Sequence, residues 1–275
     1  MTKKYSPFHI RFVQPQHVEE LLYILAEATH PLSEEEMMAE AENWSYELAS
    51  QKTPREQLST LRSLELIEEG NPTLSEKGSQ LVQIIAYKPN LAAEILHLLF
   101  YTTWNAGKPQ ERCLSRSYRR LCYLLWNRIS TKIIADALAS QLKDEIQQQF
   151  PDAQPSVGPD TVRATSAWLK RLNPPCLFEN DGKLTFERRS FCSPELLLCA
   201  IDFIYRENKI AYASNVLLTD NHRDEICRLC LLHPESFETV LNLALSQFDF
   251  LRKGVGGGWG TYLLLERQLE LTDLL

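Results

Sequence analysis

The sequence predicts a mainly α-helical protein that carries small β-hairpins. Most long segments repeat apolar residues every three or four positions, which is the period of an amphipathic helix. Short apolar stretches flank turn residues, such as Gly70-Asn71-Pro72 and Asn180-Asp181-Gly182, and this pattern is typical of hairpins. The 275 residues are 44% hydrophobic and 24% charged, as in ordinary folded proteins, and they suffice for about two or three domains.

Charge and cysteine content narrow the class of protein. The net charge of −7 argues against binding of nucleic acid by the whole surface, but it permits a local basic patch, because charges are screened beyond about 8 Å. Seven scattered cysteines predict reduced thiols in a cytoplasmic protein. No secretory signal and no run of roughly 20 apolar residues is present, so we expect no membrane partner.

Residues 1–90 are expected to form the first domain. After a mobile lead-in with a short alternating stretch at residues 8–12, helices are predicted from residue 17, after Ser33 and after Thr53. The turn at residues 70–72 then joins two short strands. A last helix begins at Ser75, which is a suitable N-cap residue.

Residues 91–190 are expected to form the second domain. Helices are predicted over 91–104, 112–132 and 131–150, and a Pro- and Gly-containing connector follows. Asp160 is expected to cap a further helix, and the residues on either side of Asn180-Asp181-Gly182 are expected to form a hairpin.

Residues 191–275 are expected to form the third domain. Helices are predicted over 194–206, over 221–232 and from Pro234 onward. Apolar strands at 248–251 and 262–265 flank the loop RKGVGGGWG, whose glycines suit a tight turn.

The repeated order of helices followed by a hairpin resembles the winged helix-turn-helix, so we expect tandem winged-helix modules. The segment Leu74-Ser75-Glu76-Lys77-Gly78 lies just after the first hairpin. It resembles the L-T-E-K-G signature found at that place in several bacterial winged-helix regulator families. The resemblance covers about residues 17–88.

The segment from Arg112 to Lys132 is the most basic in the chain and contains no acidic residue. On a helix, the arginines at 112, 116, 119 and 120 share one arc, and apolar residues occupy the opposite arc. Permanently charged guanidinium groups bind phosphate oxygens well, so this arc predicts a phosphate-binding ridge. The alternative is a solvated helix face whose arginines pair with acidic neighbours.

The charge distribution predicts which domain contacts DNA. Between Glu19 and Glu47 the chain has nine Glu and no Lys or Arg, which favours a protein-contacting first domain. The second domain offers basic residues on its third helix and hairpin. The predicted DNA-binding residues are Arg112, Arg116, Arg119, Arg120, Arg128, Lys132, Arg163, Lys170, Arg171 and Lys183. The glycine-rich tip with Trp259 is a further candidate for a groove or base contact.

No reaction is indicated by any motif. His222, Cys227, Cys230 and His233 are spaced like zinc ligands, but the two cysteines lie in a helical pattern and are expected to be buried thiols. Asp202 and the Glu207-Asn208-Lys209 segment do not show the adjacent-strand arrangement of a metal-dependent nuclease site. GVGGGWG lacks the Lys-Ser/Thr of a phosphate-binding loop. We therefore expect no enzyme, no cofactor and no bound metal.

The run Ser115-Arg116-Ser117-Tyr118-Arg119-Arg120 is similar to the arginine-rich helix of the small A component of BREX anti-phage systems. The resemblance covers about residues 110–275. It implies a non-enzymatic, DNA-binding accessory protein of a bacterial defence or DNA-modification system, with double-stranded DNA and other subunits of a defence complex as the expected partners. The competing hypothesis is a protein-interaction adaptor whose acidic winged helices dock a larger partner.

Overall fold

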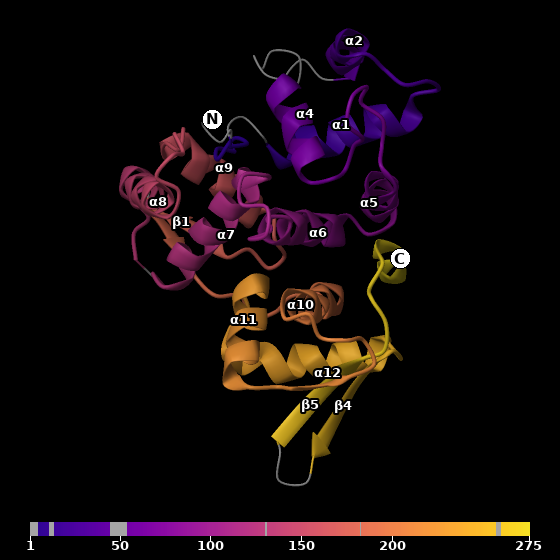
Figure 1. Ribbon diagram of the computed structural model, residues 1–275, viewed down its shortest axis with the longest axis vertical. Helices are drawn as coiled ribbons and strands as arrows, with labels where there is room; N and C mark the ends of the chain where they lie inside the picture. The colour runs from indigo at the N-terminus through magenta and orange to yellow at the C-terminus, as the bar shows by residue number, and fades with distance from the viewer. Residues whose placement is uncertain (1–4, 11–13, 45–53, 130, 182, 257–259) are drawn as a thin grey trace.

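The computed structural model describes residues 5–10, 14–44, 54–129, 131–181, 183–256 and 260–275 (Figure 1). Its helices are α1 (Pro15–Glu27), α2 (Glu34–Trp44), α4 (Pro54–Ser63), α5 (Glu76–Tyr87), α6 (Pro89–Thr102), α7 (Cys113–Trp126), α8 (Ala135–Gln149), α9 (Pro159–Lys170), α10 (Pro194–Glu207), α11 (Asp220–Cys230) and α12 (Phe237–Gln247). Its strands are β1 (Leu177–Asn180), β2 (Lys183–Phe186), β3 (Asn215–Leu217), β4 (Leu251–Gly256) and β5 (Gly260–Leu265), and the short 3₁₀ turns are η1 (Pro234–Ser236) and η2 (Leu271–Leu274). The predicted mainly helical class with small hairpins is confirmed.

Helices α1, α2, α4 and α5 form the N-terminal part of the molecule. The predicted caps at Ser33 and Ser75 are present: each side chain accepts a backbone N–H three residues later, from Glu36 at 3.2 Å and from Gly78 at 3.0 Å. The predicted cap at Thr53 lies outside the described residues. The hairpin expected after α4 is reduced to one antiparallel bridge between Ile67 and Leu74.

The lead-in was expected to be mobile, and for residues 5–10 this expectation is wrong. Phe8 and Ile10 are buried, and the Tyr5 and Phe8 rings lie 5.6 Å and 6.3 Å from the Phe150 ring at the end of α8. Burial of aromatic surface therefore fixes this segment on the second part of the chain.

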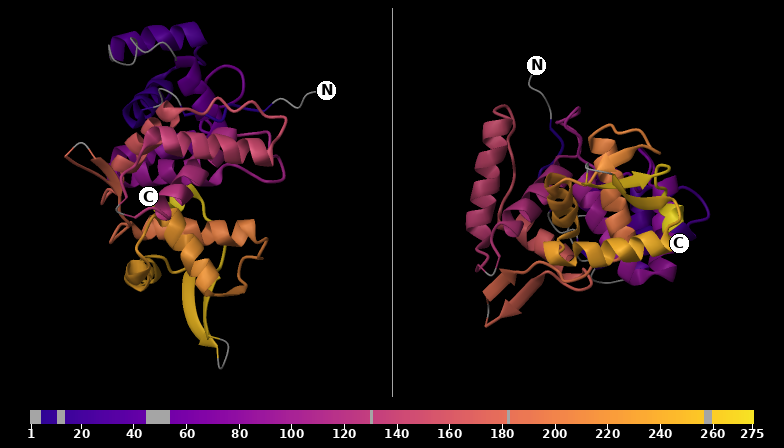
Figure 2. Two further views of the ribbon diagram at one scale, coloured as in Figure 1. Left: turned by 90° about the vertical axis from the view of Figure 1, so that its left-hand side faces the viewer. Right: turned by 90° about the horizontal axis from the view of Figure 1, so that it is seen from below.

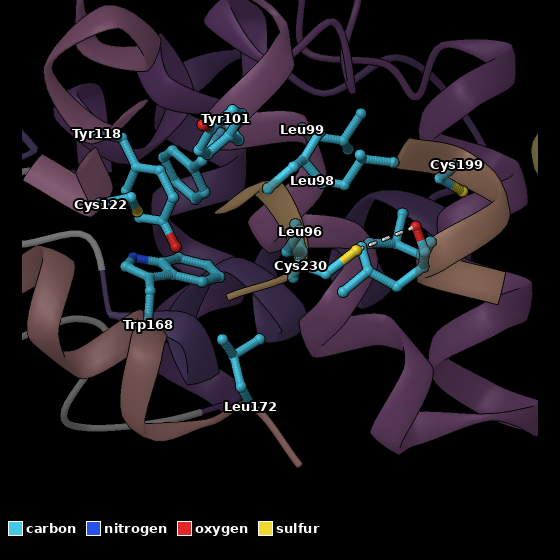
Figure 3. Packing of buried hydrophobic residues seen from close by; sticks show 14 of the residues in the cluster. Leu96, Leu98, Leu99, Tyr101, Tyr118, Cys122, Trp168, Leu172, Cys199 and Cys230 are labelled. Carbon is cyan, nitrogen blue, oxygen red and sulfur yellow. Dashed lines mark hydrogen bonds between the residues drawn. The ribbon is translucent and has the colours of Figure 1, made fainter. Parts of the chain in front are cut away.

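Helix α6 lies at the centre of the fold. Every residue from Leu91 to Tyr101 is buried, and α6 packs against α5, α7, α9 and α10. Phe100 contacts Tyr118 of α7 and Trp168 of α9, with ring centroids 5.1 Å and 4.7 Å apart. Figure 3 shows leucines of α6 packed in the same cluster as Tyr118, Trp168 and buried cysteines. A helix that is buried on all sides needs other elements around it, and the neighbours of α6 supply them.

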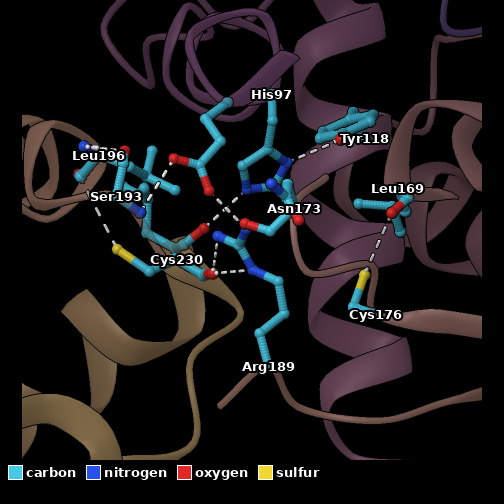
Figure 4. A network of polar contacts seen from close by, with 11 residues as sticks. His97, Tyr118, Leu169, Asn173, Cys176, Arg189, Ser193, Leu196 and Cys230 are labelled. Carbon is cyan, nitrogen blue, oxygen red and sulfur yellow. Dashed lines mark hydrogen bonds and ion pairs between the residues drawn. The ribbon is translucent and has the colours of Figure 1, made fainter. Parts of the chain in front are cut away.

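A buried polar network fixes α6 to the C-terminal part of the chain (Figure 4). Arg189 Nη1 lies 2.5 Å from a carboxylate oxygen of Glu94, and both side chains are almost completely buried. The same guanidinium donates to the Cys230 carbonyl at 2.7 Å and 3.1 Å. His97 binds the Tyr118 hydroxyl at Nδ1 and the Leu229 carbonyl at Nε2, both at 2.7 Å. Two side chains therefore satisfy the last carbonyls of α11 inside the core.

Helices α7, α8 and α9 precede the hairpin β1–β2. The end of α7, the start of α8 and the N-cap of α9 differ from the predictions. The helix expected over 112–132 ends at Trp126, and α8 begins at Ala135 rather than residue 131. Between these two helices, Lys132 forms an antiparallel bridge with Thr185, so a one-residue third strand lies beside β2 of the hairpin. Asp160 was expected to be the cap of α9, but Gly158 holds that position and Asp160 lies in the first turn.

The C-terminal part has the order α10, β3, α11, α12, β4, β5, and its sheet has the strand order β3-β5-β4. Its three helices lie on one side of the long hairpin, which projects away from the rest of the molecule in Figures 1 and 2. Strand β3 was not predicted from the sequence. Residues 252–256, predicted as loop, belong to β4, which pairs with β5 from Leu251 to Gly256.

All seven cysteines are buried free thiols, as predicted for reduced core residues. Among the described residues, no helix has the length and apolar character needed to cross a bilayer.

Candidate nucleic-acid interface

In the structure, most guanidinium groups of the segment from Arg112 to Arg128 contact other elements of the fold. Arg112 precedes α7 in a left-handed conformation and pairs with Glu65 at 2.5 Å. Arg120 forms two bonds with the Glu145 carboxylate of α8, at 2.5 Å and 2.8 Å. Arg128 donates to a glutamine oxygen of α8 at 2.7 Å. The pairing with acidic neighbours considered as the alternative to an exposed ridge is therefore present.

The remaining two arginines are further enclosed. Arg119 lies 3.9 Å from Glu207 and 3.7 Å from Glu225, and its guanidinium lies over the Phe203 ring. Arg116 is only 8% exposed and donates to Gln149 at the end of α8. Their predicted role in DNA binding stays a prediction, because both guanidinium groups are packed between α7 and neighbouring helices, where a duplex backbone would not reach them without a rearrangement of the fold.

The pKa values report the same contacts. The hydrogen bonds from Arg120 lower the pKa of Glu145, and those bonds in turn raise the pKa of Arg120. Burial lowers the pKa of Arg116, because a desolvated cation is less stable. Burial acts to raise the pKa of Glu65, but Lys77 and Arg112 outweigh it and the pKa is lowered.

Helix α9, the hairpin β1–β2 and the segment before α8 place four other predicted residues around the hairpin, on its two sides. Along α9 only a narrow stripe reaches the surface, and it carries Arg163 and Lys170, whose side chains are 67% and 44% exposed. A groove of about 220 Å³ runs between this stripe and the hairpin. It is lined by Ile133, Ala135, Val162, Arg163, Ser166, Ala167, Lys170 and Leu184.

Lys132 and Lys183 lie on the opposite face of the same hairpin. Side chains alternate along a strand, and Leu184 lines the groove, so Lys183 and Thr185 point to the other face. Lys132 is paired with Thr185 and therefore shares that face. Both lysines are exposed. We call Lys132, Arg163, Lys170 and Lys183 the hairpin surface; they come from three separate segments of the chain.

Acidic residues accompany part of the hairpin surface. Arg163 pairs with Asp160 at 2.6 Å, and Lys170 pairs with Glu179 at 3.0 Å. These are exposed pairs, which contribute little to stability and can exchange partners with a phosphate. Arg171 is as exposed as Lys170, but its side chain extends to α1, where it bonds to Glu19 at 2.6 Å, so it is not counted in the hairpin surface.

The two basic residues at the base of the C-terminal hairpin are both paired with carboxylates. Arg252 pairs with Glu266 at 2.5 Å, and Lys253 pairs with Glu238 of α12 at 2.6 Å. Val255 near the tip is 79% exposed, and Gly260 has the left-handed conformation expected for a turn glycine, with φ of 89°. Trp259 lies outside the described residues.

The residues considered for metal or nuclease chemistry have structural contacts. Cys227 and Cys230 are buried in α11, and the His222 ring bonds to the Leu217 carbonyl at 2.8 Å. Asp202 is buried and accepts hydrogen bonds from Arg206, Tyr212 and the Leu269 backbone. Within the described ranges, no group of three or more potential metal ligands is found.

No protein-family model, curated protein or solved structure matches the chain in the three comparisons with known proteins. The residues that sequence reasoning did not find are the partners of the arginines, such as Glu145, Gln149 and Glu225. They lie on other helices, and no spacing rule links them to α7.

Proposed function

We propose that this protein is a non-enzymatic DNA-binding accessory protein that contacts duplex phosphates through the hairpin surface. The observation that supports this most is the convergence of Lys132, Arg163, Lys170 and Lys183 around one projecting hairpin. Basic side chains on α9 and on the opposite face of the neighbouring hairpin suit contact with the two phosphate rows that border a groove. A role in a bacterial defence or DNA-modification system remains part of the proposal.

The element order supports tandem winged-helix modules as the framework. Helices α7, α8 and α9 followed by β1–β2 have the order of a helix-turn-helix with a wing. The C-terminal part adds a strand between its first two helices and pairs it with the returning strand of the hairpin, in the sheet order β3-β5-β4. In this framework α9 is the recognition helix of the second module, and the duplex contacts lie beside it.

Fluorescence anisotropy with a labelled random duplex tests the proposal. The variant Lys132→Ala/Arg163→Ala/Lys170→Ala/Lys183→Ala is expected to weaken binding by at least about tenfold, because four phosphate contacts are lost. The control Lys108→Ala/Lys209→Ala removes two exposed charges in the loops after α6 and α10 and is expected to bind like the wild type. Equal affinity of the four-residue variant and the wild type would contradict the proposal.

A protein-interaction adaptor is the second candidate, and the acidic first part of the chain favours it. Nine Glu and no Lys or Arg occur between Glu19 and Glu47, and Glu35, Glu36 and Glu40 of α2 are exposed. This surface suits a basic protein partner. Absence of duplex binding by the wild type, together with a stable complex in pull-down experiments, would favour the adaptor over the DNA-binding protein.

A further inference from the structure

A cavity of about 250 Å³ lies between the end of α6, the arginine face of α7, the end of α8 and α11. Four of its nine lining residues are arginines and three are aromatic. The lining residues are Tyr101, Trp104, Arg116, Arg119, Arg120, Tyr123, Gln149, Glu225 and Arg228. The hairpin surface contributes no residue to this cavity.

Arg116 is the unusual member of the cavity wall. It is more than nine-tenths buried, its hydrogen-bond acceptor is the neutral amide of Gln149, and its Nη1 atom has no hydrogen-bond partner. Among the described residues, no carboxylate lies within 4 Å of this guanidinium, and its other close contact is the Phe150 ring at 5.0 Å. Burying a cation is costly when its hydrogen-bond acceptor is a neutral amide and its nearest carboxylate, Glu145, acts only through space, so Arg116 is suited to bind an anion in the cavity.

The other arginines of the cavity wall are held in place by their neighbours: Arg120 bonds to Glu145, and Arg228 pairs with Asp224. Arg119 alone among these three makes no close hydrogen bond to a carboxylate of the described residues. The distances from Arg119 to its two carboxylates, 3.7 Å and 3.9 Å, exceed those of charge-assisted hydrogen bonds. Arg119 is positioned instead by the Tyr101 ring at 5.4 Å. Arg120 and Arg228 lie over the Tyr123 ring at 4.4 Å and 4.9 Å. Cation–π contacts therefore preorganise the guanidinium groups around the cavity.

We infer that this cavity binds the phosphate group of a small phosphate ligand, with Arg116 and Arg119 as the main donors. A guanidinium fork matches the tetrahedral oxygens of phosphate, and a dianion would neutralise the unpaired charge of Arg116. The cavity lies just below the usual range of about 300–1,000 Å³ for drug-sized ligands, so the fit is to inorganic phosphate or a small phosphomonoester. This inference is independent of the proposed duplex binding.

Thermal unfolding in phosphate and in chloride at equal ionic strength tests the inference. The wild-type midpoint is expected to rise with phosphate concentration, because a ligand that binds only the folded state stabilises it. Arg116→Met keeps most of the side-chain volume and removes the charge, so it is expected to abolish the phosphate-dependent rise without lowering the midpoint in chloride. Arg223→Met, on α11 but outside the cavity, is the matched control and is expected to keep the rise.

A second ligand and a second variant complete the test. Titration with 5′-AMP distinguishes a phosphomonoester from inorganic phosphate. The ligand of the class that the cavity binds is expected to reach half-saturation of the stabilising effect at the lower concentration. Arg228→Gln, on the opposite wall, is expected to raise the half-saturating phosphate concentration at least about threefold, even if Arg116→Met does not fold. The inference is overturned if the wild type shows no rise beyond chloride with either ligand, or if folded Arg116→Met or Arg228→Gln responds like the wild type.

Discussion

At the scale of single residues, the pair of Arg189 and Glu94 joins the central helix α6 to the segment that leads into α10. Burial alone acts to lower the pKa of Arg189, but the adjacent Glu94 carboxylate outweighs it and the pKa is raised. Glu94 also accepts the Ser193 backbone N–H at 3.1 Å, just before α10. The pair therefore fixes the segment between the two hairpin-containing parts of the chain onto α6.

Arg189→Met is expected to lower the free energy of unfolding by about 3–5 kcal/mol, because it leaves the Glu94 carboxylate buried without its counter-charge. Adding Glu94→Gln is expected to restore part of that loss, since a neutral amide costs less to bury. Urea denaturation measures both effects. A loss below about 1 kcal/mol in the single variant, or no recovery in the double variant, would show that the pair contributes little.

His97 is expected to make stability depend on pH. Burial lowers its pKa from 6.5 to about 4. The unfolded chain therefore takes up this proton below pH 6.5 while the folded chain does not. The contribution of neutral His97 to the free energy of unfolding is therefore fully present above pH 6.5. It declines by roughly 3 kcal/mol as the pH falls to 4.

The variant His97→Gln supplies the control for this pH dependence. Gln retains one acceptor for the Tyr118 hydroxyl and one donor for the Leu229 carbonyl, but it does not titrate. Between pH 6.5 and 5, the midpoint urea concentration of the wild type is expected to fall more steeply than that of His97→Gln. Parallel curves would contradict the assignment of a neutral buried imidazole.

At the scale of elements, the start of α5 explains the signature segment found in the sequence. Ser75 caps the helix and also donates to the Glu65 carbonyl at 2.6 Å, and Lys77 pairs with the Glu65 carboxylate. Gly78 lies against the same turn: a Cβ atom there would lie 2.0 Å from the Leu66 carbonyl oxygen. The segment is therefore a docking point between α5 and the turn after α4.

Gly78→Ala is expected to destabilise the protein by about 1–3 kcal/mol, since the added methyl group displaces the Leu66 backbone. This outcome opposes helix propensity, which favours Ala over Gly by about 1 kcal/mol. Ser79→Ala, at the next and exposed position, is the control and is expected to have little effect. Chemical denaturation of the two variants decides whether packing or helix propensity dominates at position 78. If Gly78→Ala is as stable as the wild type, the close contact with the Leu66 carbonyl is excluded.

Secondary structure with a strong local signal was predictable from the sequence, whereas weakly marked elements were not. The periodic helices and the caps at Ser33 and Ser75 depend on neighbours within one or two helical turns, so the residues that determine them all lie in a short stretch of sequence. Strand β3 has only three residues and is stabilised by pairing with β5, some 45 positions later, for which the local sequence offers no signal. Lys132 likewise leaves the predicted arginine helix because it pairs with Thr185.

At the scale of the whole molecule, contacts between distant segments decide which basic residues are available. Arg112, Arg119 and Arg171 each pair with a carboxylate more than 40 positions away. The C-terminal turn η2 also returns to the first part of the chain, where Lys88 donates to the Leu274 carbonyl at 2.7 Å. The sequence predicted a basic second domain, but only tertiary structure separates the enclosed arginines of α7 from the exposed hairpin surface.

The salt dependence of duplex binding tests the central claim most directly. Each phosphate contact contributes about 0.9 to the slope of log affinity against log salt concentration. Removing Lys132 and Lys183 by alanine substitution is therefore expected to reduce the magnitude of that slope by roughly 1.8, while Lys108→Ala/Lys209→Ala leaves it unchanged. An unchanged slope in Lys132→Ala/Lys183→Ala would contradict the claim that the hairpin surface contacts DNA.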